Sequence, residues 1–286
     1  MDYLSREALL HFIDLALAED LGDGDHSTLA SIGAEAERQA QAVLKDRTCV
    51  VAGVELARLI FHRLDPSLDF RAMTKDGEWV EPDKVLFTVS GKARPILSAE
   101  RLALNCLQRM SGIATLTRQL IQELEGTRAR LLDTRKTTPN FRLCEKWAVK
   151  IGGGENHRFG LFDMMMLKDN HIDFAGGVAL AMQRAKAYRE AHKKNLKLVV
   201  EVRNLEEVRQ ALDEGGAQRL LLDNMDATAL HQAVDYIAGR VPTEASGGIG
   251  PHNLREVALS GVDFISMGAL THSARSVDIS LKAIQS

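Results

Sequence analysis

The chain has 286 residues, of which 45% are hydrophobic, and its formal net charge is −3 at pH 7. This length fits one large or two medium domains with a sizeable apolar core, and so small a charge provides no basic field to draw the protein to nucleic acid or to a membrane surface. No apolar run approaches the roughly 18 residues that a membrane helix needs. Cys49, Cys106 and Cys144 are too widely spaced for a disulfide framework or a zinc motif, and the first residues lack the blocks of a signal peptide, so we expect a cytoplasmic protein.

The first third of the chain mixes helices with short strands and does not alternate regularly. Ser5 is placed to cap a helix that runs to about Leu17, and a second helix is expected over 53–63. Short strands are expected at 39–45, 48–52, 68–73 and 85–90. The acidic loop at 19–28 lacks the ligand spacing of an EF-hand, so we interpret it as a structural turn.

A long helix is expected to begin at Ser98, a suitable N-cap residue, because apolar residues then recur at steps of three and four along one face. The pattern of the sequence changes after this helix. We therefore place the domain boundary within it, which gives a first domain over 1–104 and a second domain over 105–272.

The second domain alternates strictly between apolar strands and helices. The strands are expected at 130–133, 161–168, 197–202, 219–222, 243–245 and 263–267. The helices are expected at 177–193, 205–214, 227–239 and 251–260, with Asn204 and Asp226 as caps and Pro251 as a first helical residue. This alternation predicts an α/β fold in which helices cover a parallel sheet.

The spacing of polar residues at the strand ends favours a closed or nearly closed barrel. Glu201, Asp223, Ser246 and Gly268 each follow or end a strand, at intervals of 22, 23 and 22 residues, which is one strand-plus-helix unit each time. An open doubly wound sheet is the alternative, although no GxGxxG turn follows an early strand.

Charged and glycine residues gather at these strand ends, where the active site of an α/β barrel lies. Five basic side chains suit a ligand with several carboxylates or phosphates: Arg135, Lys136, His157, Arg158 and Lys168. The turns at 246–248 and at Gly268 are typical of a barrel phosphate site. Glu201 and Asp223 would hold Mg²⁺, bind ribose hydroxyls or stabilise a developing positive charge. Each residue alone has an ordinary structural explanation, and it is their occurrence in register with the repeat that favours an anion site.

Several motifs in this half resemble quinolinate phosphoribosyltransferases. They are LDTRKTTP at 132–139, GGGENHRFGLFD at 152–163 and LKDNHI at 167–172. The resemblance continues in order through 201–202, 222–225, 244–249 and 265–273, and it includes 19–28 and 100–105 in the first domain. It therefore spans nearly the whole chain.

The resemblance implies a reaction between quinolinate and 5-phosphoribosyl 1-pyrophosphate that needs Mg²⁺ and gives nicotinate mononucleotide, pyrophosphate and CO₂ for de novo NAD synthesis. It implies an N-terminal α/β sandwich domain, an open, incomplete α/β barrel and a C-terminal helix over 273–286 that returns to the first domain. It also implies a homodimer or hexamer in which Arg101 is donated across the interface.

The resemblance further assigns roles to the residues at the strand ends. Glu201 and Asp223 would lie by the ribose and would be the tentative Mg²⁺ ligands. The residues implied to hold the carboxylates and the pyrophosphate are Arg101, Thr134, Arg135, Lys136, His157, Arg158 and Lys168. Those implied to hold the 5-phosphate are Ser246, Gly247, Gly248 and Gly268. The residues implied to be catalytic are Lys136, Lys168, Glu201 and Asp223.

Two alternatives stay open at this point. One is a related pyridine phosphoribosyltransferase, or a molybdenum-linked homologue of the same fold, which would act on another substrate. The other is a non-catalytic barrel that binds phosphate and senses metabolites, for which the pair of Glu201 and Asp223 beside the basic residues would have no purpose.

Overall fold

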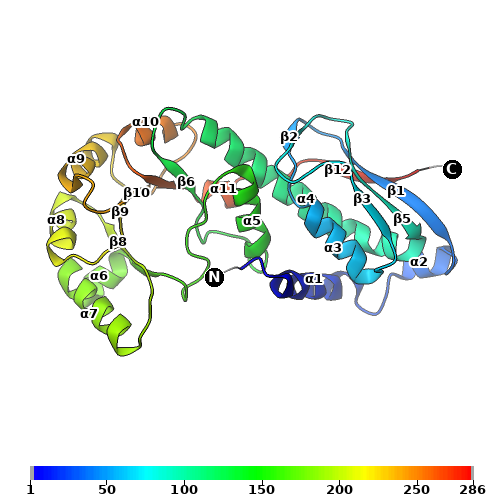
Figure 1. The fold of residues 1–286 in the computed structure, drawn as a ribbon, viewed down its shortest axis with the longest axis horizontal. Coiled ribbons are helices and arrows are strands. Elements are labelled where there is room, and N and C mark those ends of the chain that lie inside the picture. Colours follow the sequence, from blue (N-terminus) through cyan, green and yellow to red (C-terminus); the bar gives the residue numbers. More distant parts are fainter. Residues whose placement is uncertain (1–2, 285–286) are drawn as a thin grey trace. The chain divides into compact units, whose positions relative to one another are not determined.

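A computed structural model describes residues 3–284, and their fold is drawn in Figure 1. These residues form two units, each with its own sheet. One, which we call the barrel unit, comprises Gln119–Lys136 and Gly154–Ala269. The other, the sheet unit, comprises the described residues before Gln119 and after Ala269, together with Thr137–Gly153.

The barrel unit is built on a six-stranded sheet in the order β6-β11-β10-β9-β8-β7, with every neighbouring pair parallel. Its strands are β6 (Arg130–Leu132), β7 (Met165–Leu167), β8 (Leu198–Val202), β9 (Arg219–Asp223), β10 (Thr243–Ser246) and β11 (Phe264–Ser266). Strands β6 and β7 stand at the two ends of this order, so the sheet is an open, incomplete barrel. The predicted fold class is confirmed.

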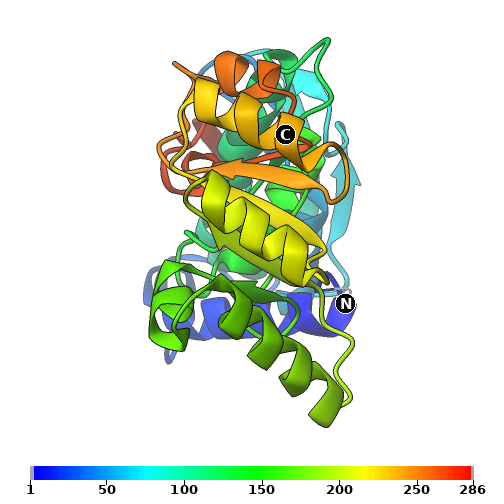
Figure 2. The same cartoon turned by 90° about the vertical axis from the view of Figure 1, so that its left-hand side faces the viewer.

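Helices connect and cover these strands, as Figure 2 shows for the outer side of the sheet. They are α6 (Asp169–Ala175), α7 (Val178–Ala191), α8 (Leu205–Glu214), α9 (Ala227–Ile237) and α10 (Leu254–Leu259). The predicted caps are confirmed, because Asn204 accepts from the Glu207 amide and Asp226 accepts from the Ala229 amide. Pro251 lies before α10, so its placement as a first helical residue is wrong.

The sheet unit contains a four-stranded antiparallel sheet in the order β12-β1-β5-β3. These strands are β1 (Glu37–Leu44), β3 (Asp69–Ala72), β5 (Val85–Lys92) and β12 (Ile279–Ala283), and a short pair is formed by β2 (Cys49–Val50) and β4 (Trp79–Val80). The helices are α1 (Arg6–Leu21), α2 (His26–Ser31), α3 (Val54–Leu64), α5 (Arg142–Gly152), α11 (Ala269–His272) and the long α4 (Ala93–Gln122), of which α4 and α11 each extend past a unit boundary. Phe70 and Phe87 stack with ring centroids 4.6 Å apart in the core of this unit.

Two predictions about this part of the chain are wrong. No helix forms over the described residues of the predicted C-terminal helix at 273–286; the chain there forms strand β12 over Ile279–Ala283. In β12, Ile279 and Leu281 alternate with polar residues, and the strand pairs antiparallel with β1. Residues 285 and 286 of that prediction lie outside the described residues. Helix α4 begins at Ala93 rather than at Ser98, so Ser98 is an interior residue and not an N-cap.

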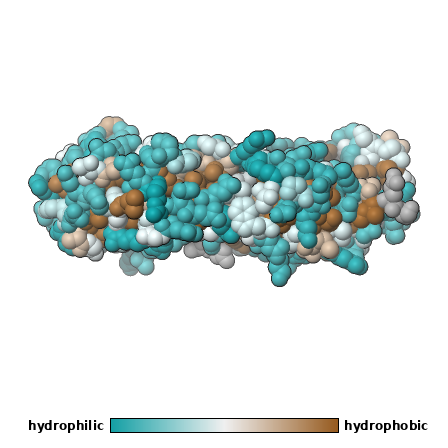
Figure 3. All heavy atoms as spheres, turned by 90° about the horizontal axis from the view of Figure 1, so that it is seen from above, coloured by the Kyte–Doolittle hydropathy of each residue, from teal (hydrophilic) through white to brown (hydrophobic). Residues whose placement is uncertain are grey.

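Polar residues cover most of one face of the molecule. Figure 3 shows one face, on which hydrophilic residues predominate and hydrophobic residues form small separate patches. None of the helices within residues 3–284 is long and apolar enough to cross a membrane.

Candidate active site

The carboxyl ends of the barrel strands bring several of the predicted residues to one edge of the sheet. Asp223 at the end of β9 is in register with Ser246 at the end of β10. Glu201 on β8 is in register with Leu221, two residues before Asp223. Since residues two apart on a strand share a face and register partners lie on the same face, Glu201 and Asp223 project to the same side of the sheet, one pleat apart.

Glu201 is the more buried of the two carboxylates and is held by two donors. Its Oε2 lies 3.2 Å from Nζ of Lys168, and its Oε1 accepts from the Asp169 amide at 3.2 Å. The Lys168 side chain remains about half exposed while that of Glu201 is almost fully buried. Lys168 therefore presents an ammonium group to solvent beside a fixed carboxylate.

The pKa of Asp223 is raised, first because burial disfavours the charged carboxylate and then because Glu201 lies nearby. The hydrogen bond from Asn224 and the charge of Lys168 act in the opposite direction. Two carboxylates that repel each other at an edge of the sheet fit a site for a cation or for groups that carry positive charge.

The turn after β10 has the backbone of an anion site. Gly247 and Gly248 have φ angles of 91° and 62°, a left-handed region that glycine enters without strain. Beyond them, the Gly250 amide donates to Oδ1 of Asn253 and the Asn253 side chain donates to the Gly248 carbonyl, which fixes the turn before α10. Gly268 lies between β11 and α11 and directly precedes the helix.

Arg158 and Arg135 approach each other in the barrel unit. Burial lowers the pKa of Arg158, and the charge of Arg135 lowers it further, while Asp163 opposes them. Thr134 accepts a hydrogen bond from the Lys136 amide at 3.0 Å and so shapes the loop that carries Arg135. Two neighbouring guanidinium groups repel, and an anion bound between them would relieve that repulsion.

His157 lies in a buried network inside the barrel unit. Its amide donates to Oδ1 of Asp133 at 2.9 Å, and its Nδ1 accepts from the Arg158 amide at 2.7 Å, which places the ring proton on Nε2. Nε2 lies 3.2 Å from Oε2 of Glu244, which also accepts from Arg219 at 2.7 Å. Both ring nitrogens thus face protein groups, and the substrate-binding role of His157 stays a prediction.

Glu244 was not among the predicted site residues, although it is fully buried. Burial raises its pKa, but the hydrogen bond with His157 and the presence of Arg219 outweigh that effect, and the pKa is lowered overall. The signal in the sequence was an acidic residue in the middle of a strand expected in a parallel sheet that helices cover, where a charge is unfavourable unless it is paired.

Glu145 on α5 is a second buried carboxylate that sequence reasoning missed. It accepts from the Thr138 amide and from the Thr138 hydroxyl, each at 3.0 Å, and from Arg109 at 3.0 Å. Arg142, at the start of the same helix, donates to the Thr137 hydroxyl at 2.9 Å. These bonds anchor the two threonines that directly follow Lys136 in the chain.

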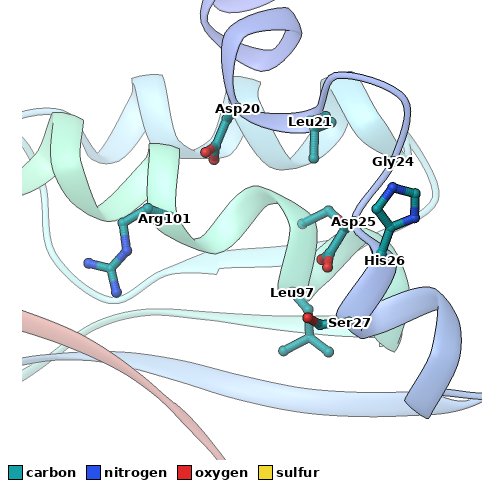
Figure 4. A pocket seen from close by; sticks show the side chains of 9 residues that line it. Asp20, Leu21, Gly24, Asp25, His26, Ser27, Leu97 and Arg101 are labelled. Atoms are coloured by element: carbon teal, nitrogen blue, oxygen red, sulfur yellow. The ribbon is translucent and has the colours of Figure 1, made fainter.

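Arg101 belongs to the sheet unit, where it lies on α4 beside the acidic loop. Figure 4 shows the hollow of about 410 Å³ that it lines. The Arg101 residue is exposed, and its guanidinium group makes no hydrogen bond or ion pair with any other side chain among residues 3–284. Asp25 on the opposite side caps α2 by accepting from the Thr28 amide and also accepts from Ser98, in agreement with the interpretation of this loop as a structural turn.

Comparisons with known proteins extend this picture to the whole chain. Two family models match it, quinolinate phosphoribosyl transferase N-terminal domain over residues 25–111 and quinolinate phosphoribosyl transferase C-terminal domain over residues 113–282. The chain is 46% identical over 285 residues to the chloroplastic nicotinate-nucleotide pyrophosphorylase (carboxylating) of Arabidopsis thaliana, which covers 94% of this chain and 81% of that protein. It is 44% identical over 285 residues to quinolinate phosphoribosyltransferase (decarboxylating) 1b of Nicotiana tabacum, with 94% and 81% covered. The solved structure of the nicotinate-nucleotide pyrophosphorylase from Francisella tularensis superposes with a TM-score of 0.90 at 35% identity and covers 98% of both chains.

Proposed function

Because the chain belongs to the quinolinate phosphoribosyltransferase family, we propose that it transfers the phosphoribosyl group of 5-phosphoribosyl 1-pyrophosphate to quinolinate and releases pyrophosphate and CO₂. The product is nicotinate mononucleotide, and the reaction supplies NAD synthesis. One observation carries the proposal. Lys168, Glu201 and Asp223 lie beside a glycine turn, all at the carboxyl ends of adjacent strands.

Each part of that edge matches one part of the substrates. The Ser246–Gly248 turn and Gly268 offer backbone amides to the 5-phosphate. The basic residues that would bind the two carboxylates of quinolinate and the pyrophosphate are Arg135, Lys136, His157, Arg158 and Lys168. Thr134 would bind substrate beside them and shapes the loop that carries Arg135 and Lys136. Glu201 and Asp223 would bind the ribose hydroxyls, since carboxylates accept hydrogen bonds from them.

The chemistry follows from this placement. The ring nitrogen of quinolinate attacks C1 of the ribose, the bond from C1 to the pyrophosphate oxygen breaks, and its electron pair leaves with pyrophosphate. Positive charge develops on the ribose, and the carboxylates of Glu201 and Asp223 would stabilise it. The product nitrogen is cationic, so the ring accepts the electron pair of the adjacent C–CO₂ bond, CO₂ leaves and a proton takes its place.

The same two carboxylates fit a magnesium site that is completed by substrate. Within residues 3–284 no group of three or more His, Cys, Asp or Glu side chains is placed to hold a metal ion. Mg²⁺ is commonly bound by one or two carboxylates together with substrate phosphates, which is the set that Glu201, Asp223 and pyrophosphate provide. Bound there, the ion would neutralise charge on the leaving pyrophosphate.

The proposed enzyme is a homodimer or hexamer in the cytoplasm, in which Arg101 completes the site of a neighbouring subunit. Support for the donated arginine comes from the exposed guanidinium of Arg101, which has no hydrogen bond or ion pair among the described residues. Three buried, unpaired cysteines, Cys49, Cys106 and Cys144, fit a reducing compartment.

A direct assay tests the proposed function. The purified protein is mixed with 5-phosphoribosyl 1-pyrophosphate, Mg²⁺ and quinolinate, and CO₂ and nicotinate mononucleotide are measured, with nicotinate in place of quinolinate as the control. Equal amounts of CO₂ and nucleotide from quinolinate are expected. Turnover of nicotinate alone would point to the related transferase, and ligand binding without turnover of either substrate would favour the metabolite-sensing barrel.

A further inference from the structure

Asn224 follows Asp223 at the end of β9 and has an unusual backbone. Its φ angle is 53°, in the left-handed region that few residues other than glycine and asparagine adopt. Its amide donates to the Ser246 carbonyl at 2.9 Å, and its side-chain Nδ2 donates to Oδ2 of Asp223 at 2.6 Å. One residue is therefore bonded both to the carboxylate on β9 and to the strand that leads into the glycine turn.

The Asn224 side chain also packs against that turn. A Cβ atom on Gly247 would overlap Oδ1 of Asn224 and would lie 2.6 Å from its Cγ. Gly247 has a φ of 91°, so both its backbone conformation and the space beside it require glycine. The side-chain amide of Asn224 thus fills the gap between the Asp223 carboxylate and the Ser246–Gly248 turn.

Other residues at position 224 would not combine the left-handed backbone with a side-chain donor to Asp223. Glycine would accept the left-handed backbone without strain but would leave Oδ2 of Asp223 without this donor. Aspartate has nearly the same shape, but it would replace the donor with a third carboxylate beside Asp223 and Glu201, which already repel each other. Asparagine supplies the backbone conformation, the donor and the neutral charge together.

We propose that Asn224 is a positioning residue that holds the Asp223 carboxylate at a fixed place relative to the Ser246–Gly248 turn. The inference rests on the proposed function, in which the carboxylate receives ribose hydroxyls and the turn receives the 5-phosphate of the same sugar. Because the ribose ring is rigid, both groups bind well only if their separation matches it. Loss of the side-chain amide of Asn224 therefore weakens binding of the phosphoribosyl substrate more than binding of quinolinate.

Three variants separate this role from a general effect on folding. Asn224→Gly keeps the backbone conformation and removes the side-chain amide. Asn224→Asp keeps the shape of the side chain and removes the Nδ2 donor to Asp223. Asn204→Gly is the matched control, because it removes an asparagine side chain that caps α8 after the neighbouring strand β8. The measurements are KM for each substrate, kcat, the melting temperature, and the Kd of ribose 5-phosphate by calorimetry, which needs no turnover.

Both Asn224 variants are expected to raise KM for 5-phosphoribosyl 1-pyrophosphate and Kd for ribose 5-phosphate about fivefold, or about 1 kcal/mol. KM for quinolinate should change less than about twofold, as should every constant of Asn204→Gly. The inference is overturned if ribose 5-phosphate binds Asn224→Gly as tightly as it binds the original protein, or if both KM values rise together with a lower melting temperature. If the original protein binds ribose 5-phosphate but releases no CO₂, the proposed function fails while the comparison of Kd values still decides the role of Asn224.

Discussion

Glu244→Gln is expected to destabilise the barrel unit strongly. Glu244 is fully buried, and its Oε2 lies 2.7 Å from Arg219 and 3.2 Å from His157. Removing one partner of a buried ion pair costs about 3–5 kcal/mol, because the other charge is left without compensation. We expect the lower end, about 3 kcal/mol, since Arg219 is still 18% exposed and stacks on Phe264 at 3.9 Å.

The assay is thermal unfolding followed by circular dichroism. For a unit of this size, 3 kcal/mol corresponds to a fall in Tm of roughly 6–12 °C. Glu155→Gln is the matched control, because Glu155 pairs with Arg130 at 2.9 Å in the same unit and Arg130 stacks on the same Phe264 ring, but both partners are about half exposed. An exposed pair contributes at most about 1 kcal/mol, so this control should lower Tm by less than about 4 °C.

The pH dependence of the same variant gives a second check. The pKa of Glu244 is lowered from 4.5 in the folded state, so its contribution to stability is present above pH 4.5 and is lost as the pH falls through the lowered pKa. The difference in Tm between the original protein and Glu244→Gln should therefore be constant near neutral pH and should narrow below pH 4.5. If Glu244→Gln lowers Tm at neutral pH no more than Glu155→Gln does, the buried ion pair of Glu244 does not stabilise the barrel unit as argued.

Three further predictions concern activity. Lys136→Ala should lower kcat/KM by at least about 100-fold because a cation that binds substrate is lost, and near-normal product formation at saturating substrates would remove its assigned role. Thr138→Val should lower kcat/KM about tenfold while Thr138→Ser keeps most activity, since only the hydroxyl bonded to Glu145 is lost; equal rates for the two would contradict this. Arg101→Ala mixed with Lys168→Ala should recover part of the activity that each lacks alone, because one site in a mixed oligomer has both residues intact, and no recovery would count against a donated arginine.

The parts of the fold that follow from local patterns could be predicted from the sequence. Helix α8 has the predicted bounds, and its cap Asn204 was found because capping depends on residues within one turn. The ends of β9 and β10 were predicted within one residue. In β9 the signal is local, since the buried apolar run Leu220–Leu222 is followed by a polar residue and then by a helix. The spacing of these ends predicted a barrel with both residues at one rim, and in the structure Asp223 and Ser246 are register partners.

The errors arise where structure depends on distant partners. Strand β12 forms because β1, near the other end of the chain, offers an edge to pair with, and five residues carry too weak an alternation to predict this alone. Helix α5 was missed because its N-cap, Phe141, provides no side-chain hydrogen bond and because buried Glu145 and Lys146 interrupt the apolar face.

The same difference applies to the candidate site. Lys168, Glu201 and Asp223 could be predicted as candidates because they lie at strand ends, where an α/β barrel places its active site. Glu145 and Glu244 each act through bonds to residues that other elements bring close. Asn224 lies at a strand end, but its role depends on the bond that its backbone amide makes to the Ser246 carbonyl of a different strand. The effect of these three residues on activity would pass through the groups they hold, so substitutions there should change the affinity for one substrate or the stability of one unit, whereas substitutions of the predicted residues should remove turnover itself.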